Sequence, residues 1–182
     1  MSNFIVNPYI LGVPCDDTQF SAGKPATNGA SVRPNGNADR IEFVGYEVQA
    51  DQAGKHVKSV LFTVGRYASG FTNGDVWCRI YEGHTGTPSY HDSVKQAVTV
   101  IPQESPFGGN PPTTETTFTF SSAVTIEAGY VVAFGGDFGS QANYCSIGFG
   151  ANYDGGYTYL LNNGSWVSYN GYGTSIVINY EC

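Results

Sequence analysis

The side chains that could carry chemistry are spread along this chain of 182 residues and form no known catalytic motif. The three histidines, His56, His84 and His91, show neither HExxH nor another short metal-ligand spacing, so we expect exposed histidines and no metal site. A GxSxG elbow and a phosphate-binding loop are also absent. Two carboxylates can hydrolyse a glycosidic bond, but the sequence fixes the placement of no such pair. We therefore expect no catalysis and no cofactor. A hydrolase is the least favoured of three function hypotheses, and the other two are given at the end of this section.

Acidic residues in Gly-rich stretches are the next candidates. "GGD" at 135–137, "YDGG" at 153–156 and the adjacent Asp16 and Asp17 contain the oxygen ligands that calcium prefers. None of these stretches forms a complete D-x-D-x-D-G loop, so turn formation is the better interpretation. "NGS" at 163–165 fits a glycosylation site, but Asn-Gly between "YLLN" and "SWVSY" predicts a hairpin turn.

One stretch, residues 143–173, combines many aromatic side chains with amides and a carboxylate. Aromatic rings that stack on sugars, beside groups that bond hydroxyls, are what a glycan site requires. The same mixture suits a protein interface, or these residues simply cover a sheet face and line turns. For a glycan site the candidates are Trp166, Tyr169, Tyr172 and Asn170, within a set that comprises Tyr144, Asn152, Tyr153, Asp154, Tyr157, Tyr159, Asn162, Asn163, Trp166, Tyr169, Asn170 and Tyr172.

These side chains must be positioned by β-strands, because beyond Asp39 apolar residues recur with a period of two. Residues 41–50 predict a first strand, with a bulge or bend at Gly45. In residues 58–66 one face carries Val60, Phe62 and Val64. In residues 75–83 one face carries Val76, Cys78 and Ile80, with Trp77, Arg79 and Tyr81 opposite. We predict that these two strands form one antiparallel hairpin through residues 67–74, in a sheet with one buried face.

Further short strands follow at 96–101, 116–122, 130–136, 144–150, 157–161, 165–169 and 174–182. Gly and Pro turns separate them, and no window has the period of a long helix. Many short strands at this spacing predict an all-β fold, a two-sheet antiparallel β-sandwich that is jelly-roll-like. We expect one sandwich domain over residues 41–182.

Residues 1–40 predict an extended N-terminal arm, because Pro, Gly, Asn and Ser interrupt every period. Its start is too apolar for a segment that stays in solvent. One interpretation is that this part packs on its own domain as an added strand, and the other is that it reaches a neighbouring subunit. The candidate interface residues are Phe4, Ile5, Val6, Tyr9, Ile10 and Leu11.

The charge and the apolar content of the chain limit the kinds of partner that it can bind. The formal net charge is −7 and the pI is about 4.7, which disfavours nucleic acid as a partner. Residues 1–8 lack the features of a secretion signal, and no stretch is apolar enough to span a membrane. The four cysteines are far apart and are most simply reduced thiols, although pairing of Cys15 with Cys182 stays open.

Residues 57–136 resemble a β-sandwich module of bacteriophage virion proteins and some bacterial surface proteins. The likeness lies in "D-V-x-x-R-I-Y-x-G" at Asp75–Gly83, the "G-x-P" turn at Gly86–Pro88, and "F-x-F-S-x-x-V-T-I-x-A-G-Y" at Phe118–Tyr130. The resemblance implies a jelly-roll-like fold and a role in virion assembly, capsid decoration or glycan attachment. Fold likeness alone does not settle function.

Two function hypotheses follow. The favoured one is a non-enzymatic virion structural protein, made in the host cytoplasm, that decorates or cements a phage capsid and uses residues 1–40 as a clamp. Its partners would be the major capsid protein or other virion proteins, and further copies of itself. The alternative is a receptor- or carbohydrate-binding module of a phage tail or fibre.

Overall fold

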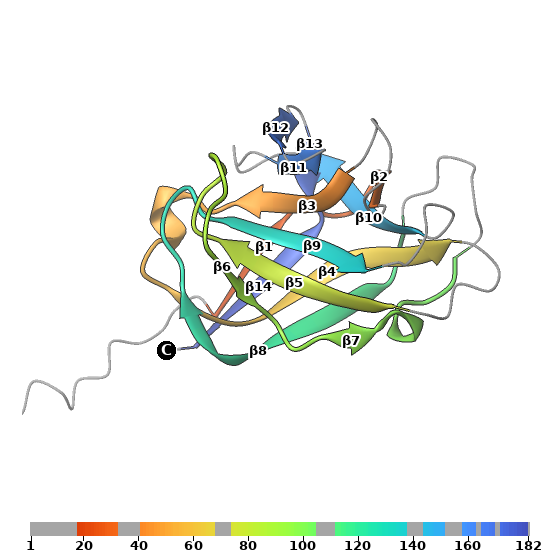
Figure 1. Cartoon of the computed structure of the whole chain (residues 1–182), viewed down its shortest axis with the longest axis horizontal. Helices are drawn as coiled ribbons and strands as arrows, with labels where there is room; N and C mark the ends of the chain where they lie inside the picture. The colour runs from red at the N-terminus through yellow and green to blue at the C-terminus, as the bar shows by residue number, and fades with distance from the viewer. Residues whose placement is uncertain are drawn as a thin grey trace, which may run out of the picture.

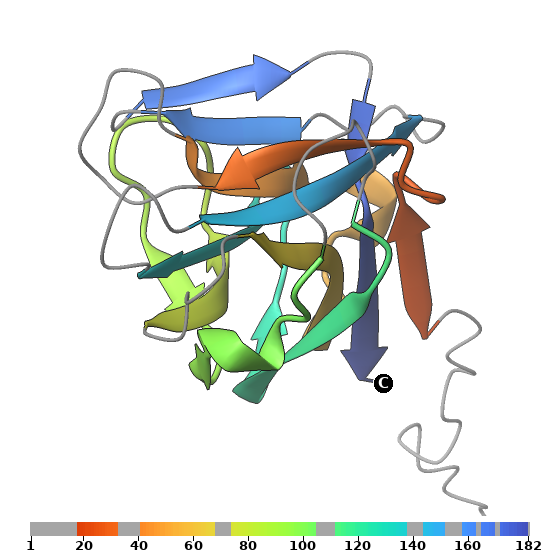
Figure 2. The same ribbon diagram turned by 90° about the vertical axis from the view of Figure 1, so that its right-hand side faces the viewer.

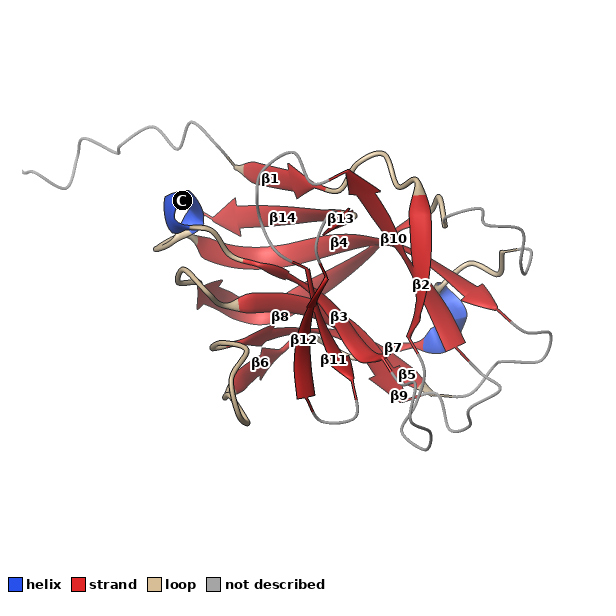
Figure 3. Ribbon diagram, turned by 90° about the horizontal axis from the view of Figure 1, so that it is seen from above, coloured by secondary structure: helices blue, strands red, loops and turns tan. Residues whose placement is uncertain are grey.

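The computed structural model describes residues 18–32, 41–67, 74–104, 112–137, 144–151, 158–162, 165–169 and 172–181. Within these ranges the chain is an all-β sandwich of two antiparallel sheets, as the sequence predicts (Figure 1). Two three-residue 3-10 turns, Ala50–Gln52 and Val98–Val100, lie at opposite ends of the molecule (Figure 3). No helix in the described part of the chain has the length and apolar character to cross a bilayer.

The first sheet is built around the longest strand, β4 (His56–Tyr67). It pairs with β8 on one side, and with β14 and then β10 on the other. The strand order is β1 (Gln19–Ala22), β14 (Ile176–Glu181), β4, β10 (Tyr144–Ala151) and β13 (Tyr172–Thr174), with β8 (Glu115–Thr125) paired to β4 and β2 (Asn28–Val32) paired to β10.

In the second sheet β3, β9 and β5 run side by side across the molecule (Figure 1). The strand order is β12 (Ser165–Tyr169), β11 (Thr158–Asn162), β3 (Ile41–Glu47), β9 (Val131–Asp137), β5 (Asp75–Tyr81) and β6 (Tyr90–Asp92), with β7 (Gln96–Ala97) paired to the start of β5. The β11–β12 hairpin that Asn-Gly predicts is confirmed by the pairing of Asn162 with Ser165.

The main core lies between the two sheets and uses the faces that the period of two indicates. Val60, Val64, Val76 and Ile80 are fully buried there, as are most of the other predicted core residues. Three rings link the sheets: Phe62 of β4, Phe118 of β8 and Phe134 of β9, with ring centroids 5.6–6.2 Å apart. Burial of this apolar surface is the dominant favourable contribution to folding.

The predicted hairpin of residues 58–66 with 75–83 is wrong. Strand β4 belongs to the first sheet and β5 to the second, so the connection between them crosses from one sheet to the other. A hairpin and a crossover give the same alternating pattern, because each strand buries one face against the same core in both cases. The sequence alone therefore does not distinguish them.

Two smaller predictions also need correction. Gly45 keeps the regular register of β3 with β9, so it marks no bulge. A Cβ atom at this position would lie 2.5 Å from Cγ1 of Val131 and 2.8 Å from Cβ of Ala133, so the glycine permits close packing of these strands. Of the predicted strand 96–101, only Gln96–Ala97 is a strand and a 3-10 turn follows it.

Part of the predicted arm belongs to the sandwich. Strand β1 pairs with β14, and β2 pairs with β10, so residues 19–32 are edge strands of the first sheet. Each of these strands has four or five residues, too few for a period of two to stand out. The candidate interface residues between Phe4 and Leu11, with Cys15, lie outside the described residues.

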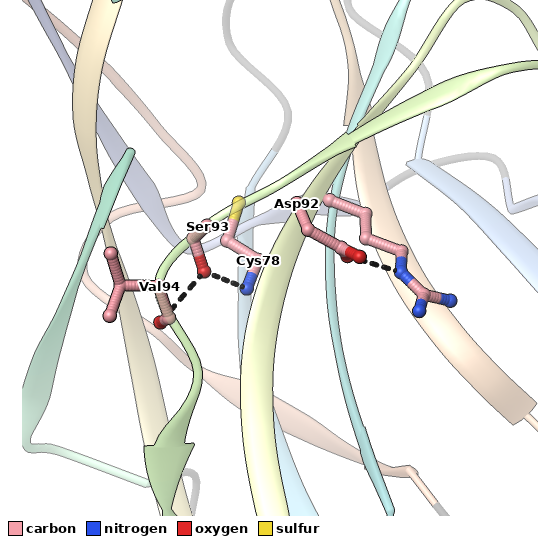
Figure 4. A network of polar contacts seen from close by, with 5 residues as sticks. Cys78, Asp92, Ser93 and Val94 are labelled. Atoms are coloured by element: carbon pink, nitrogen blue, oxygen red, sulfur yellow. Dashed lines mark hydrogen bonds and ion pairs between the residues drawn. The ribbon is translucent and has the colours of Figure 1, made fainter. Parts of the chain in front are cut away.

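The segment after β6 closes one side of the sandwich. The Val94 N–H donates to the carbonyl of Thr119 on β8 over 2.8 Å, and Nε2 of Gln96 donates to the carbonyl of Thr117 over 2.6 Å. Just before them, Oγ of the buried Ser93 accepts the N–H of Cys78 over 2.9 Å and donates to the carbonyl of Val94 over 3.3 Å (Figure 4). This segment therefore ties the edge of the second sheet to β8 of the first.

Candidate functional site

The second sheet carries a separate apolar cluster on its outer face, away from the main core. Trp77, Tyr81, Val131 and Ala133 are buried in it, and Leu161 and Trp166 pack against them. Trp77, Arg79 and Tyr81 point to this side because they alternate with core residues along β5, as the sequence predicts. The prediction of a single buried face is wrong at β5, since Trp77 and Tyr81 are almost as buried as the core side.

The β11–β12 hairpin covers this outer face. In Figure 2 the hairpin lies at the top of the molecule, at the end of the second sheet. The ring of Trp166 meets the ring of Tyr81 edge-on, with centroids 4.9 Å apart. Tyr81 also contacts Tyr90 of β6, with ring centroids 5.4 Å apart. Tyr81 thus forms the centre of an aromatic row whose ends are Trp166 and Tyr90.

A guanidinium group completes this surface. The Arg79 guanidinium lies 4.2 Å from the ring centroid of Tyr90 and 4.9 Å from that of Trp77. Its Nε donates to Oδ1 of Asp92 over 2.6 Å, between directly paired residues of β5 and β6 (Figure 4). Lys95 Nζ lies 5.0 Å from the ring centroid of Trp77. Cation–π contacts of this kind contribute about 0.5–2 kcal/mol each.

We name this surface the aromatic face and define it by Trp77, Arg79, Tyr81, Tyr90 and Trp166. The side chain of Tyr90 is 47% exposed and Trp166 is half-buried, whereas Trp77 and Tyr81 are buried beneath them. Solvent therefore meets one exposed ring, one half-exposed ring and the Arg79–Asp92 pair. The ring and cation–π contacts restrict these side chains, so little side-chain entropy remains to be lost when a partner binds.

The electrostatics of the face follow from burial. Burial raises the pKa of Tyr81 to about 12, although the neighbouring Arg79 lowers it. For Arg79, burial opposes the charge, but hydrogen bonds to Asp92 and Tyr81 outweigh it and raise the pKa. The Tyr81 phenol is therefore neutral at physiological pH, and the Arg79 guanidinium stays charged beside the carboxylate of Asp92. The exposed ring of Tyr90 can stack on a partner, and the Arg79–Asp92 pair can hydrogen-bond to it.

The described residues contain no group of three His, Cys, Asp or Glu side chains that could hold a metal ion. Two of the three histidines have simple partners. His56 Nδ1 shares a hydrogen bond of 3.1 Å with Thr125 Oγ1, and His91 Nε2 lies 3.2 Å from Glu82 Oε1 at the exposed end of the β5–β6 pair.

The predicted glycan residues are divided between the two sheets. Trp166 and Tyr169 lie on β12 of the second sheet, and Tyr172 lies on β13 of the first. Trp166 joins the aromatic face. The side chains of Tyr169 and Tyr172, and all of Asn170, lie outside the described residues.

Sequence reasoning missed the partners of Trp166. Alternation along β5 correctly placed Trp77, Arg79 and Tyr81 on one face, and it was the only pattern in the sequence that pointed to these residues of the aromatic face. Tyr90 and Asp92 could not be added, since only the pairing of β6 with β5 brings them opposite Tyr81 and Arg79.

Comparison of the chain with protein-family models, with curated proteins and with solved structures finds no match.

Proposed function

We propose that this chain is a non-enzymatic structural protein of a bacteriophage virion, which decorates the capsid and attaches in part through the aromatic face. The observation that carries the proposal is the composition of that face. Trp, Tyr and Arg are the residues that contribute most to binding at protein interfaces, and here they contact one another, with Tyr81 at the centre and the exposed ring of Tyr90 at one end.

The resemblance of residues 57–136 to virion modules supports the same class. That range supplies most of β4, β5 and most of β9, which pair with strands on both sides, together with β8 and β6, which lie beside β4 and β5. The resembling part therefore carries four of the five residues of the aromatic face, and the β11–β12 hairpin adds the fifth, Trp166. The apolar residues 4–11 would form a second attachment surface outside the resembling part.

The mechanism we propose is burial of apolar area, at about 25 cal/mol per Å², repeated over symmetric copies. Many weak contacts then hold each copy on the shell and stabilise the shell in turn. The predicted residues Phe4, Ile5, Val6, Tyr9, Ile10 and Leu11 would add to this area.

The first test is quantitative mass spectrometry of purified particles, in which we expect hundreds of copies of the chain per particle. A few to a few dozen copies would indicate that the protein belongs to the tail, and absence from particles would refute the proposal.

The second test is rebinding to particles that lack the protein. Deletion of residues 2–16 and Tyr90→Ala should each lower occupancy, and both leave β1 and β2 in place. Full occupancy with both changes combined would contradict the mechanism.

A second candidate, a carbohydrate-binding role, is favoured by one observation. The exposed Tyr90 ring stands next to the charged pair of Arg79 and Asp92, and stacking rings beside hydrogen-bonding groups are what sugars require. On a glycan array the wild-type protein should then give signals that Tyr90→Ala abolishes. Val167→Ala is the control, because this exposed side chain lies on the same strand as Trp166 and next to it in sequence. Equal signals from Tyr90→Ala and the control would exclude this role for the face.

A further inference from the structure

A pocket of about 350 Å³ opens on the first sheet, away from the aromatic face. It lies at the junction of two consecutive strands, β13 and β14, which Ser175 separates. Strand β13 pairs with β10, whereas β14 pairs with β4. The N–H of Ser175 donates to Gly148 of β10 and its carbonyl accepts from Thr63 of β4, so Ser175 joins both strands. The residues that line the pocket are Lys24, Pro25, Ala26, Thr63, Pro112, Thr113, Glu115 and Ser175.

Two hydroxyl groups form the buried part of the pocket. Oγ1 of Thr63 and Oγ of Ser175 are 2.8 Å apart, in residues that are only 5% and 1% exposed. One hydrogen bond between two hydroxyls uses one of their two hydrogens, so the pair has a second hydrogen to donate. A buried hydroxyl pair of this kind can donate a hydrogen bond to a polar ligand, and both hydroxyls stay uncharged when it does so.

Gly148 keeps the space around these hydroxyls open. A Cβ atom at residue 148 would lie 2.7 Å from Cβ of Ala26, 3.3 Å from Cβ of Thr63 and 3.4 Å from Cβ of Ser175. All three of these neighbours line the pocket. Any larger residue at this position of β10 would therefore enter the space between the lining side chains.

An ion pair forms the solvent side of the pocket. Lys24 Nζ contacts Oε1 of Glu115, and both side chains are partly exposed. Burial lowers the pKa of Lys24 from its ordinary value. An ammonium has three N–H donors and a carboxylate has two acceptor oxygens, so each partner can also bind a ligand. The pair thus presents a donor and an acceptor side by side, with no net charge.

We propose that this pocket binds one sugar unit through two neighbouring hydroxyls. One sugar hydroxyl accepts from Lys24 and the adjacent one donates to Glu115, while the Thr63–Ser175 pair bonds a third polar atom. Pro25, Ala26 and Pro112 supply apolar walls for the C–H groups of the ring. The volume is at the lower end of the range of small-molecule sites, as a single ring requires. The neutral ion pair and the hydroxyls favour an uncharged polyol over phosphate or an amine. This inference is independent of the proposed virion role.

The test is saturation-transfer NMR and calorimetric titration of the full chain with a panel of methyl pyranosides, with inorganic phosphate and glycine as charged probes. We expect at least one pyranoside to bind with millimolar affinity. Glu115→Gln should weaken it about tenfold, since the acceptor loses its charge and the hydrogen bond becomes weaker, and Lys24→Met should act similarly because it removes the donor. Thr63→Val removes one of the two buried hydroxyls at nearly constant side-chain volume and should weaken binding severalfold.

Two matched controls locate the site. Lys58→Met breaks another partly exposed Lys–Glu pair, with Glu181 at 3.5 Å, and should leave sugar binding unchanged. Tyr90→Ala distinguishes the two candidate sugar sites, because Tyr90 belongs to the aromatic face and does not line the pocket. The proposal is overturned if no pyranoside binds, if only phosphate or glycine binds, or if Glu115→Gln binds as tightly as Lys58→Met. Binding that Tyr90→Ala abolishes would assign the sugar to the aromatic face instead.

Discussion

The rings of Trp166 and Tyr81 lie 4.9 Å apart, although three strands of the second sheet separate β12 from β5. In a flat sheet these four strand steps would span about 19 Å. The register also places Trp166 level with Trp77, four residues before Tyr81 on β5. The sheet must therefore coil enough to bring the Trp166 side chain of the β11–β12 hairpin against Tyr81 on the outer face. This coiling creates the aromatic face.

Trp166→Ala should lower the free energy of unfolding by about 1–3 kcal/mol. This is below the range for a fully buried Trp, because Trp166 is half-buried. Urea denaturation measures the loss, and near-UV circular dichroism should show a weaker aromatic signal. Val167→Ala on the same strand should stay within about 0.5 kcal/mol of wild type. Equal effects from the two changes would mean that the hairpin does not pack on Tyr81.

The Arg79–Asp92 pair should contribute a small but measurable coupling. A double-mutant cycle with Arg79→Met and Asp92→Asn should give about 0.5–1 kcal/mol, because solvent screens a pair that is partly exposed. Arg79→Lys should not restore the stability, since an ammonium cannot stack on Tyr90 as a planar guanidinium does. The same cycle on Lys58 and Glu181, which are more exposed and 3.5 Å apart, should give a value near zero. A larger coupling there would contradict this ranking.

Gly45→Ala should destabilise the fold by about 1–3 kcal/mol. The new methyl group would meet side-chain carbons of Val131 and Ala133 and the carbonyl of Val132 at 3.0 Å, inside a sheet that cannot easily move. Gly65→Ala is the matched control, because its closest neighbour is the flexible carboxylate of Glu104. We expect thermal unfolding to show a clearly lower Tm for Gly45→Ala than for Gly65→Ala. Equal Tm values would show that the strands can separate to admit a side chain.

Alkaline pH should destabilise the protein through groups whose pKa is raised by burial. The pKa of Tyr81 is about 12 in the folded chain, against about 10 when unfolded, so between these values only the unfolded chain releases the proton. Tyr81 makes its full contribution to the free energy of unfolding below about pH 10. This contribution decreases toward pH 12, by at most about 1.4 kcal/mol per pH unit. Burial also raises the pKa of Cys145 to about 12, so the decline begins near pH 9.

Urea titrations from pH 8 to about pH 11 measure this decline. Tyr81→Phe should reduce the slope above about pH 10 and leave the slope below it unchanged. An identical slope in wild type and Tyr81→Phe would show that the Tyr81 phenol is ionised equally well in both states. In the same samples, iodoacetamide should label Cys78 and Cys145 only after unfolding, because both thiols are buried and burial raises their pKa values.

The sequence by itself determined the fold class and most of the core. Alternation of Val60, Phe62 and Val64, and of Val76, Cys78 and Ile80, identified the buried faces, since a strand presents every second side chain to one side. Asn-Gly at 163–164 likewise determined the β11–β12 hairpin, because turn chemistry is local.

Only the tertiary structure decided which strands are neighbours, and so which side chains form a surface. The pattern of a strand is the same whether the next strand pairs with it or crosses to the other sheet, and β4 and β5 take the second course. The aromatic face depends on the pairing of β5 with β6 and on the coiling that brings Trp166 of β12 to Tyr81 of β5. The pocket depends on the contact of Lys24 with Glu115, 91 positions along the chain. Such contacts depend on strand order and sheet curvature, which are properties of the whole packed chain and leave no local pattern in the sequence.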